Sequence, residues 1–454
     1  MRRRTRPALA IAAVTALALS MSACAGWGGG PGGGGENSIN VLMVNNPQMI
    51  DLERLTAANF TKDTGITVNY TVLPENDLRD KASQEFTSQA GQYDVATLSN
   101  FEIPIYATRG WIAPLDKYAA TDPTFDQADI LPTMATSLSS GGTLYGEPFY
   151  GESSFLMYRK DVLDAAGIQM PAHPTWQQVA DIAAKVDGTR PGMAGICLRG
   201  QPGWGQMIAP LTTVVNTFGG TWFTADWHAQ VNDAGFRKAT QFYVDLVRAH
   251  GEAGAPQAGF TECLNALIQG DAAMWYDATS AAGSLEAADS PVKGKIGYAP
   301  APVVETTSSG WLYAWSWSIQ EASKKKDNAW KFISWASGKE YEQLVGSELG
   351  WSRVPAGKRK STYEIPQYLQ VAGAFAQPTL EAITSADPNN PGVQPRPAPG
   401  IQFVGIPEFP DLGTQVSQDI SSVIAGRETV AHALDRGQQL ADDVAAFHRS
   451  REQK

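Results

Sequence analysis

The chain has 454 residues and a formal net charge of -11, with 35 Lys and Arg residues against 46 Asp and Glu residues. An acidic chain is not expected to bind nucleic acid, because contacts with phosphates need a basic surface. A chain of this length usually forms two domains.

The first 24 residues are predicted to be an export signal. Arginines precede an apolar run at 8–19, which suits a secretory signal and is too short to cross a bilayer. The residues before Cys24 (MSA) resemble a bacterial lipobox, which predicts a lipid anchor on Cys24; simple cleavage that leaves a free thiol is the alternative. The glycine-rich residues 25–37 are predicted to be a flexible tether outside the membrane.

The first part of the folded chain alternates between strand and helix patterns. A continuous apolar run begins it, Gly65 marks the end of the first helix, and alternating or fourfold spacing of apolar residues follows. The predicted elements are a strand at 38–44, a helix at 49–64, a strand at 66–72, a helix at 78–86 and a strand at 91–98. This order predicts a parallel sheet with helices on its faces.

The same alternation is expected to resume after residue 150. The predicted helices lie at 159–166, after a capping box at Thr175 and Gln178, around 329–336, and from 411 to the end, whereas 387–400 reads as a surface excursion. Two α/β halves enclose a cleft, and ligands of such sheets lie beyond the carboxyl ends of the strands.

Cys197 and Cys263 are the other two cysteines. An even pair in an exported chain favours a disulfide, and two buried thiols are the alternative. Closure of this loop would stabilise the fold by roughly 3–5 kcal/mol through the entropy of the unfolded chain.

The sequence carries few signs of catalysis. Its five histidines are scattered, it has no G-x-S-x-G motif, and its glycine tract precedes the first predicted strand, unlike a phosphate loop. Glu152 and Asp277 could serve as the acid and base of a glycosidase, and their spacing neither supports nor excludes this. We therefore expect a binding protein without a cofactor or a metal.

Four clusters combine aromatic rings with carboxylate, guanidinium, amide or hydroxyl groups. They lie at 148–154, 195–205, 270–279 and 310–318. A polyhydroxylated ligand needs this mixture, because its C–H faces pack on rings and its hydroxyls need planar polar partners. Taken singly, each tryptophan is more often a core residue than a platform for a ligand. Arg199 is less suited to a core, because a guanidinium is rarely buried without a partner.

Several segments together resemble the extracellular solute-binding proteins of ATP-binding-cassette sugar importers. They include GTLYGEPFY at 142–150, MYRKD at 157–161 and GDAAMW at 270–275, which is similar to a G-x-A-A-M segment of that family. The resemblance covers residues 38–450. The segments MVNNPQM at 43–49, PFYGESS at 148–154 and CLRG at 197–200 look most similar to mannitol- and sorbitol-type polyol binders.

The resemblance implies a two-lobed periplasmic-binding-protein-like α/β fold whose chain crosses between the lobes about three times. The implied N-lobe comprises residues 38–149 plus 304–355, and the implied C-lobe comprises residues 150–303 plus 356–454. The implied ligand-binding residues are Asn45, Asn46, Glu75, Asn100 and Trp311 in the N-lobe; Tyr150, Glu152, Arg199, Trp204, Trp275 and Asp277 in the hinge and C-lobe; and Arg353 near the third crossing.

The resemblance also implies a function. We expect a monomeric receptor, anchored to the outside of the cell membrane, that captures a sugar alcohol or sugar and delivers it to a membrane permease of the ATP-binding-cassette type. A receptor for a disaccharide such as trehalose, a secreted carbohydrate-active enzyme and a surface lipoprotein without a transport partner are the alternatives.

Overall fold

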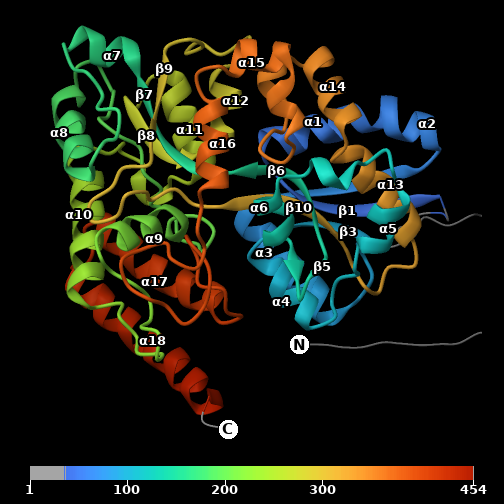
Figure 1. The fold of residues 1–454 in the computed structure, drawn as a ribbon. Coiled ribbons are helices and arrows are strands. Elements are labelled where there is room, and N and C mark those ends of the chain that lie inside the picture. The colour runs from blue at the N-terminus through green and yellow to red at the C-terminus, as the bar shows by residue number, and fades with distance from the viewer. Residues whose placement is uncertain (1–34, 36, 453–454) are drawn as a thin grey trace, which may run out of the picture. The chain divides into compact units, whose positions relative to one another are not determined.

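The structure is a computed structural model that describes residue 35 and residues 37–452. The predicted export signal, the lipid anchor at Cys24 and most of the predicted tether lie outside these residues. The two larger of the three sheets lie in separate parts of the described chain (Figure 1). We call the part around the five-stranded sheet the N-lobe and the part around the three-stranded sheet the C-lobe. The predicted two-lobed α/β fold is confirmed.

The N-lobe sheet has the strand order β2-β1-β3-β10-β6. Its strands are β1 (Ser38–Val44), β2 (Thr67–Leu73), β3 (Val95–Ser99), β6 (Glu147–Glu152) and β10 (Tyr313–Ile319). The first three strands are parallel, and β10 runs antiparallel to both of its neighbours. β1 is buried along almost its whole length, as expected for a strand made of consecutive apolar residues.

The predicted β-α-β-α-β order of the first hundred residues is confirmed. The connecting helices are α1 (Pro47–Thr56), a π-helical turn (Ala57–Thr61), α2 (Lys62–Thr64) and α3 (Glu75–Ser88). The first of these helical stretches ends at Gly65, whose φ of 70° is left-handed and therefore favours glycine. α3 buries Leu78, Ala82 and Phe86, the residues whose fourfold spacing predicts it.

Shorter helices and strands lie between β3 and β6 and again after β10. Before β6 lie α4 (Glu102–Thr108), α5 (Asp116–Thr121), η2 (Gln127–Asp129), α6 (Pro132–Ser137), β4 (Ser139–Ser140) and β5 (Thr143–Leu144). After β10 lie α13 (Lys326–Ala336), α14 (Lys339–Glu348), η5 (Trp351–Arg353), η6 (Ser361–Glu364), α15 (Pro366–Ala372) and α16 (Ala376–Thr384). The segment at 387–400 contains no helix or strand, in agreement with the predicted excursion.

The C-lobe sheet has the order β8-β7-β9 and is antiparallel throughout. Its strands are β7 (Ser154–Arg159), β8 (Met274–Ala278) and β9 (Ile296–Pro300). The alternation expected after residue 150 does not specify the direction of these strands, because β7 pairs with strands more than a hundred residues later and such long-range pairing leaves no local pattern in the sequence.

Helices make up most of the C-lobe. They are α7 (Lys160–Ala165), α8 (Trp176–Val186), α9 (Ile208–Thr217), α10 (Ala234–His250), η3 (Ala255–Gln257), α11 (Phe260–Gln269), η4 (Thr279–Ala281), α12 (Ala282–Leu285), α17 (Phe409–Ile424) and α18 (Val430–Glu452). The predicted capping box of Thr175 and Gln178 is present at the start of α8. Among the described helices, none is both long enough and apolar enough to span a membrane.

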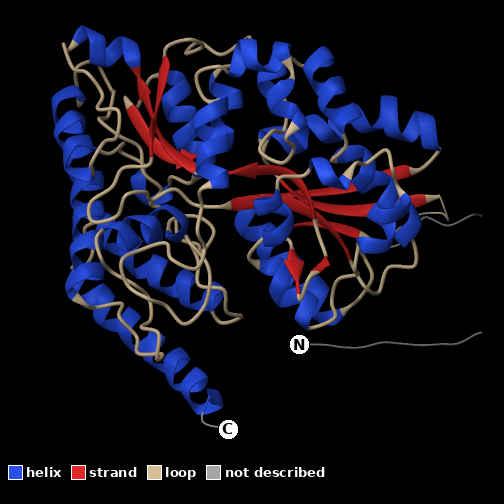
Figure 2. Cartoon of the chain, viewed as in Figure 1, coloured by secondary structure: helices blue, strands red, loops and turns tan. Residues whose placement is uncertain are grey.

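One extended stretch connects the two sheets. β6 and β7 are separated only by Ser153, and Figure 2 shows this red stretch running from the larger group of strands toward the smaller one. Gly151 donates its N–H to the carbonyl oxygen of Ala356 over 3.1 Å, and a Cβ atom on Gly151 would overlap the carbonyl oxygen of Gly357. Glycine interrupts this buried strand because a second segment approaches its backbone closely. The predicted limits of the lobes remain a prediction.

A disulfide joins Cys197 and Cys263, whose Cα atoms lie 5.5 Å apart and whose side chains are fully buried. It connects α11 to the segment beside β8, where Cys197 forms a backbone bridge with Trp275. The bond therefore links α11 to the chain that runs beside the first residues of β8.

Candidate functional site

A cavity of about 390 Å³ lies between the two lobes. This volume falls within the range that small-molecule sites usually have. Its N-lobe walls come from the residues that directly follow β1 and β2, together with β10 and the end of β6. Its C-lobe walls come from residues 199–209, the start of α11 and the end of β8. The cavity therefore lies beyond the carboxyl ends of parallel strands, where the sequence places a ligand.

The hinge side of the cavity carries a buried carboxyl group. The Glu152 Oε2 atom accepts a hydrogen bond of 2.5 Å from Ser280 Oγ, and the neighbouring Tyr150 hydroxyl accepts one of 2.9 Å from Asn46 Nδ2. Burial raises the pKa of Glu152 to about 8, although Ser280 and Arg199 oppose this shift. At neutral pH Glu152 therefore holds a proton and can both donate and accept hydrogen bonds.

The N-lobe wall is organised around Arg79. This guanidinium pairs with Glu75 at 2.7 Å and with Glu102 at 2.8 Å, and it donates a hydrogen bond to the Tyr313 hydroxyl over 2.6 Å. It also lies over the ring of Trp204, 4.0 Å from the ring centre. Burial alone would disfavour its charge, but the neighbouring Tyr313, Glu75 and Glu102 hold the pKa of Arg79 above its ordinary value.

The C-lobe wall is organised around Arg199. Its guanidinium makes a two-point ion pair with Asp277, over 2.7 Å from Nε and 2.5 Å from Nη2. The remaining nitrogen donates to the carbonyl oxygen of Gly205 and to the side-chain oxygen of Gln206. Asp277 is fully buried and also accepts a hydrogen bond from the Trp275 indole. Both charges are therefore compensated inside the protein.

The structure places part of the predicted site in the cavity lining. The predicted residues that line the cavity are Asn45, Asn46, Glu75, Tyr150, Glu152, Arg199 and Trp311. Their contact with a ligand remains a prediction.

The other predicted residues do not line this cavity. Asp277 and Trp275 lie behind Arg199, and Asn100 holds the backbone at Leu312 and Ala314. Trp204 is stacked under Arg79, and Arg353 pairs with Asp51 over 2.8 Å. Each of these polar or aromatic side chains has a protein partner, and the sequence shows only its type.

Several lining residues are missing from the predicted set. They include Arg79, Gln201, Gln206, Phe260, Ser280 and Trp315. Trp315 belongs to a predicted polar–aromatic cluster, and Gln206 and Ser280 directly follow two others, so a wider window would have found them. Arg79 carries no such signal, because its position in the polar helix α3 resembles a solvent-exposed one.

The geometry also bears on catalysis. Both carboxylate oxygens of Asp277 are hydrogen-bonded to protein groups, and the side chain has no exposed surface. Asp277 therefore cannot serve as nucleophile or base opposite Glu152. Within residue 35 and residues 37–452, no group of three or more His, Cys, Asp and Glu side chains is placed to hold a metal ion.

Comparison with known proteins assigns the class. Residues 46–343 match the bacterial extracellular solute-binding protein family, and the chain belongs to it. It is 39% identical to a mannitol-binding protein of Pseudomonas aeruginosa over 406 residues, which cover 88% of this chain and 92% of the relative. These relatives are binding proteins, and no catalytic family is indicated.

Solved structures agree with this assignment. The chain is similar to a transporter solute-binding protein of Agrobacterium vitis S4 with bound D-mannitol, with a TM-score of 0.88 and 41% identity, covering 90% of this chain and 99% of that one. It is also similar to a solute-binding protein of Agrobacterium radiobacter K84 in complex with ribitol, with a TM-score of 0.78 and 25% identity, covering 90% and 98%. The expected class of extracytoplasmic polyol- or sugar-binding receptor is therefore confirmed.

Proposed function

We propose that this protein captures a hexitol, with mannitol as the first candidate, in the cavity between its lobes and delivers it to an ATP-binding-cassette permease. The observation that carries this proposal is that Arg79 and Arg199, the cations at the centre of the two cavity walls, are both already paired with carboxylates. We call these two groups of paired residues the central clusters. The 41% identity with a protein that binds D-mannitol supports the choice of ligand.

The charge pattern favours a neutral ligand. Arg199 is neutralised by Asp277, Arg79 is paired with the two carboxylates of Glu75 and Glu102, and Glu152 is protonated at neutral pH. A phosphate or a sugar acid would find no unpaired cation in these clusters. A polyol can share hydrogen bonds with such groups without adding a charge to a buried site.

The aromatic residues add the second requirement of a polyol site. Trp311, Trp315 and Phe260 line the cavity, and the buried Trp311 indole N–H has no acceptor among the described residues. We infer that these rings pack against the C–H faces of the polyol, which is the apolar contact that such a ligand needs.

Delivery requires that the ligand changes the state of the receptor. In the proposed mechanism the ligand stabilises the closed arrangement of the lobes, and the closed form docks on the permease. A lipid on Cys24 and residues 25–37 would keep a monomeric receptor near the permease. The predicted contacts of Asn45, Asn46, Glu75, Tyr150, Glu152 and Arg199 with the ligand belong to this proposal.

A panel of ligands tests the proposal. Intrinsic tryptophan fluorescence and thermal unfolding would be recorded with hexitols, pentitols, monosaccharides, disaccharides and a hexose phosphate. We expect a saturable fluorescence change with mannitol and a stabilisation of about 2.7 kcal/mol at a hundredfold excess over the dissociation constant. A response only to disaccharides would favour the alternative receptor, and turnover of a glycoside would favour an enzyme.

A further inference from the structure

A short loop of the C-lobe makes direct contact with the N-lobe at the edge of the cavity. Residues 201–206 follow Arg199 and face the first turns of α3. Gln206 Nε2 donates to Glu75 Oε2 over 3.1 Å, and Asn76 Nδ2 donates to the carbonyl oxygen of Pro202 over 3.0 Å. We call these two groups of residues, the loop at 201–206 and residues 75–79 of α3, the closure seam.

Two glycines make the approach of the seam possible. A Cβ atom on Gly205 would overlap Arg79 Nε and lie 2.5 Å from Glu75 Oε1, and one on Gly203 would lie 2.5 Å from Asn76 Oδ1. All of the atoms nearest to such added Cβ atoms belong to side chains of the opposite lobe. Arg79 cannot move away easily, because Glu75, Glu102 and Tyr313 hold its guanidinium.

The seam also joins the two charged clusters of the cavity. The side-chain oxygen of Gln206 accepts hydrogen bonds from Arg199 Nη1 and from the backbone N–H of Phe260, while its nitrogen reaches Glu75. Gln206 has only 7% of its surface exposed. An amide suits this position, because it presents an acceptor to Arg199 and a donor to Glu75 at the same time.

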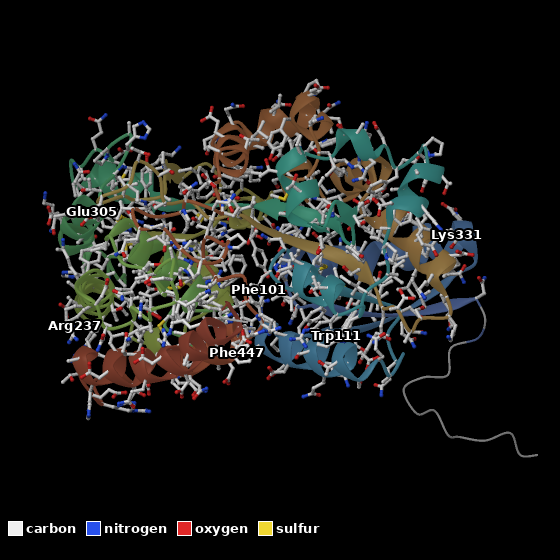
Figure 3. The ribbon with its side chains drawn as sticks, turned by 60° about the horizontal axis from the view of Figure 1, so that its bottom comes forward. Phe101, Trp111, Arg237, Glu305, Lys331 and Phe447 are labelled. Atoms are coloured by element: carbon white, nitrogen blue, oxygen red, sulfur yellow. A yellow bond between two sulfur atoms is a disulfide. The ribbon has the colours of Figure 1, made fainter. Side chains whose placement is uncertain are left out.

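Aromatic packing adds to the contact between the lobes beside the seam. Phe101 of the N-lobe packs against Trp204 and Phe403, with ring centres 4.8 and 5.6 Å apart. Figure 3 shows Phe101 between the part that carries Arg237 and Glu305 and the part that carries Trp111 and Lys331. On the hinge side, Gln48 Nε2 donates to the carbonyl oxygen of Ser280 over 3.2 Å. The lobes therefore touch on both flanks of the cavity.

We propose that the closure seam is a specificity-determining element that limits the cavity to one short polyol chain or one sugar ring. A longer ligand would have to pass between residues 75–79 and residues 201–206, and this would separate the hydrogen-bonded pairs of the seam. The inference rests on the proposed function, since it names the size of the ligand that the same cavity accepts.

Gly205→Ala tests the seam directly. The backbone at Gly205 lies outside the left-handed region, so alanine fits the loop itself and collides only with the opposite lobe. Gly254→Ala is the matched control, because Gly254 is exposed, has a φ of -93°, and an added Cβ atom there would meet only Glu252 Oε1, at 4.0 Å. Affinity for mannitol would be measured by calorimetry, and lobe closure by small-angle scattering.

We expect Gly205→Ala to bind mannitol at least tenfold more weakly and to compact less on binding, with Gly254→Ala like the wild type. We also expect the wild type to bind maltose and trehalose at least a hundredfold more weakly than mannitol. If Gly205→Ala matched the wild type in mannitol affinity and in compaction, the proposed role of the closure seam would be overturned. If the wild type bound a disaccharide as tightly as mannitol, the proposed size limit would be overturned.

A second variant guards against a failure of Gly205→Ala to fold. Asn76→Ala removes one hydrogen bond of the seam from a half-buried position on α3, and we expect it to weaken mannitol binding several-fold. Unchanged binding in this variant would overturn the seam as well. If the wild type bound no polyol or monosaccharide, the proposed function and the size limit would both fail, whereas failure of the seam alone would leave wild-type binding intact.

Discussion

The protonation of Glu152 gives a quantitative prediction for ligand binding. Burial raises its pKa to about 8, so about nine tenths of the molecules carry the proton at pH 7 and about one tenth carry it at pH 9. If the polyol binds the protonated form, its affinity should fall about tenfold between pH 7 and pH 9. This change corresponds to about 1.4 kcal/mol of binding free energy.

Glu152→Gln separates protonation from shape. Glutamine has nearly the shape of the protonated carboxyl group and likewise both donates and accepts hydrogen bonds. We therefore expect the variant to bind mannitol within about threefold of the wild type at pH 7 and to bind it equally well at pH 9. Calorimetric titrations with mannitol between pH 6 and pH 9.5 would measure both proteins.

The control is Glu340→Gln, which changes an exposed carboxylate on α14 and should retain the wild-type pH profile. Far-UV circular dichroism at each pH would verify that the proteins remain folded. A wild-type affinity that is constant from pH 7 to pH 9 would refute the reasoning. A loss of more than about tenfold in Glu152→Gln at pH 7 would also refute it, because the neutral carboxyl group could then not be the binding form.

Three further predictions concern stability. Burial also raises the pKa of Glu147 to about 8, so the folded state keeps a proton that the unfolded state loses above about pH 4.5, and stability falls as the pH rises between these values. Glu147→Gln should therefore raise the free energy of unfolding by about 3 kcal/mol at pH 7 and by less than about 1 kcal/mol at pH 5, as urea unfolding at the two pH values would show. Arg199→Ala leaves the charge of Asp277 buried and unpaired and should cost about 3–5 kcal/mol, measured against the partly exposed Arg237→Ala; a cost similar to that of the control would contradict the role of the ion pair. Reduction of the bond between Cys197 and Cys263 should lower the free energy of unfolding by roughly 3–5 kcal/mol, and an unchanged thermal midpoint under reducing conditions would contradict this.

The part of the fold that the sequence predicts well is the part that local patterns encode. β1 is a continuous apolar run, the helix after it ends at a glycine in the left-handed region, and α3 repeats apolar residues every four positions. These signals act within a few residues, so each element can be recognised by itself. Their strict alternation then leaves few possible topologies for the N-lobe sheet.

The C-lobe sheet could not be predicted in the same way. β7 pairs with β8 and β9, which arrive after several intervening helices, and no local pattern specifies an antiparallel partner so far along the chain. The resemblance to a known family indicated the two-lobed fold but not the direction of these strands.

The residues of the candidate site were likewise predicted only in part. Glu152 and Arg199 were recognisable because a charged residue inside an apolar segment needs a partner. Asp277 has the same appearance in the sequence, but it is itself the partner of Arg199 and lies behind it. Arg79 was missed because its burial arises from distant parts of the chain, namely Glu102 and Tyr313 of its own lobe and Trp204 of the other lobe. Residue type therefore suggested a polar site, whereas tertiary contacts decided which side chains face the cavity.

The most direct test of the account is small-angle X-ray scattering of the chain during a titration with D-mannitol. The account predicts a saturable decrease in the radius of gyration that is complete at one ligand per chain, because the polyol is enclosed between two lobes that close on it. A scattering curve that stays unchanged at saturating mannitol would contradict capture in the cavity between the lobes.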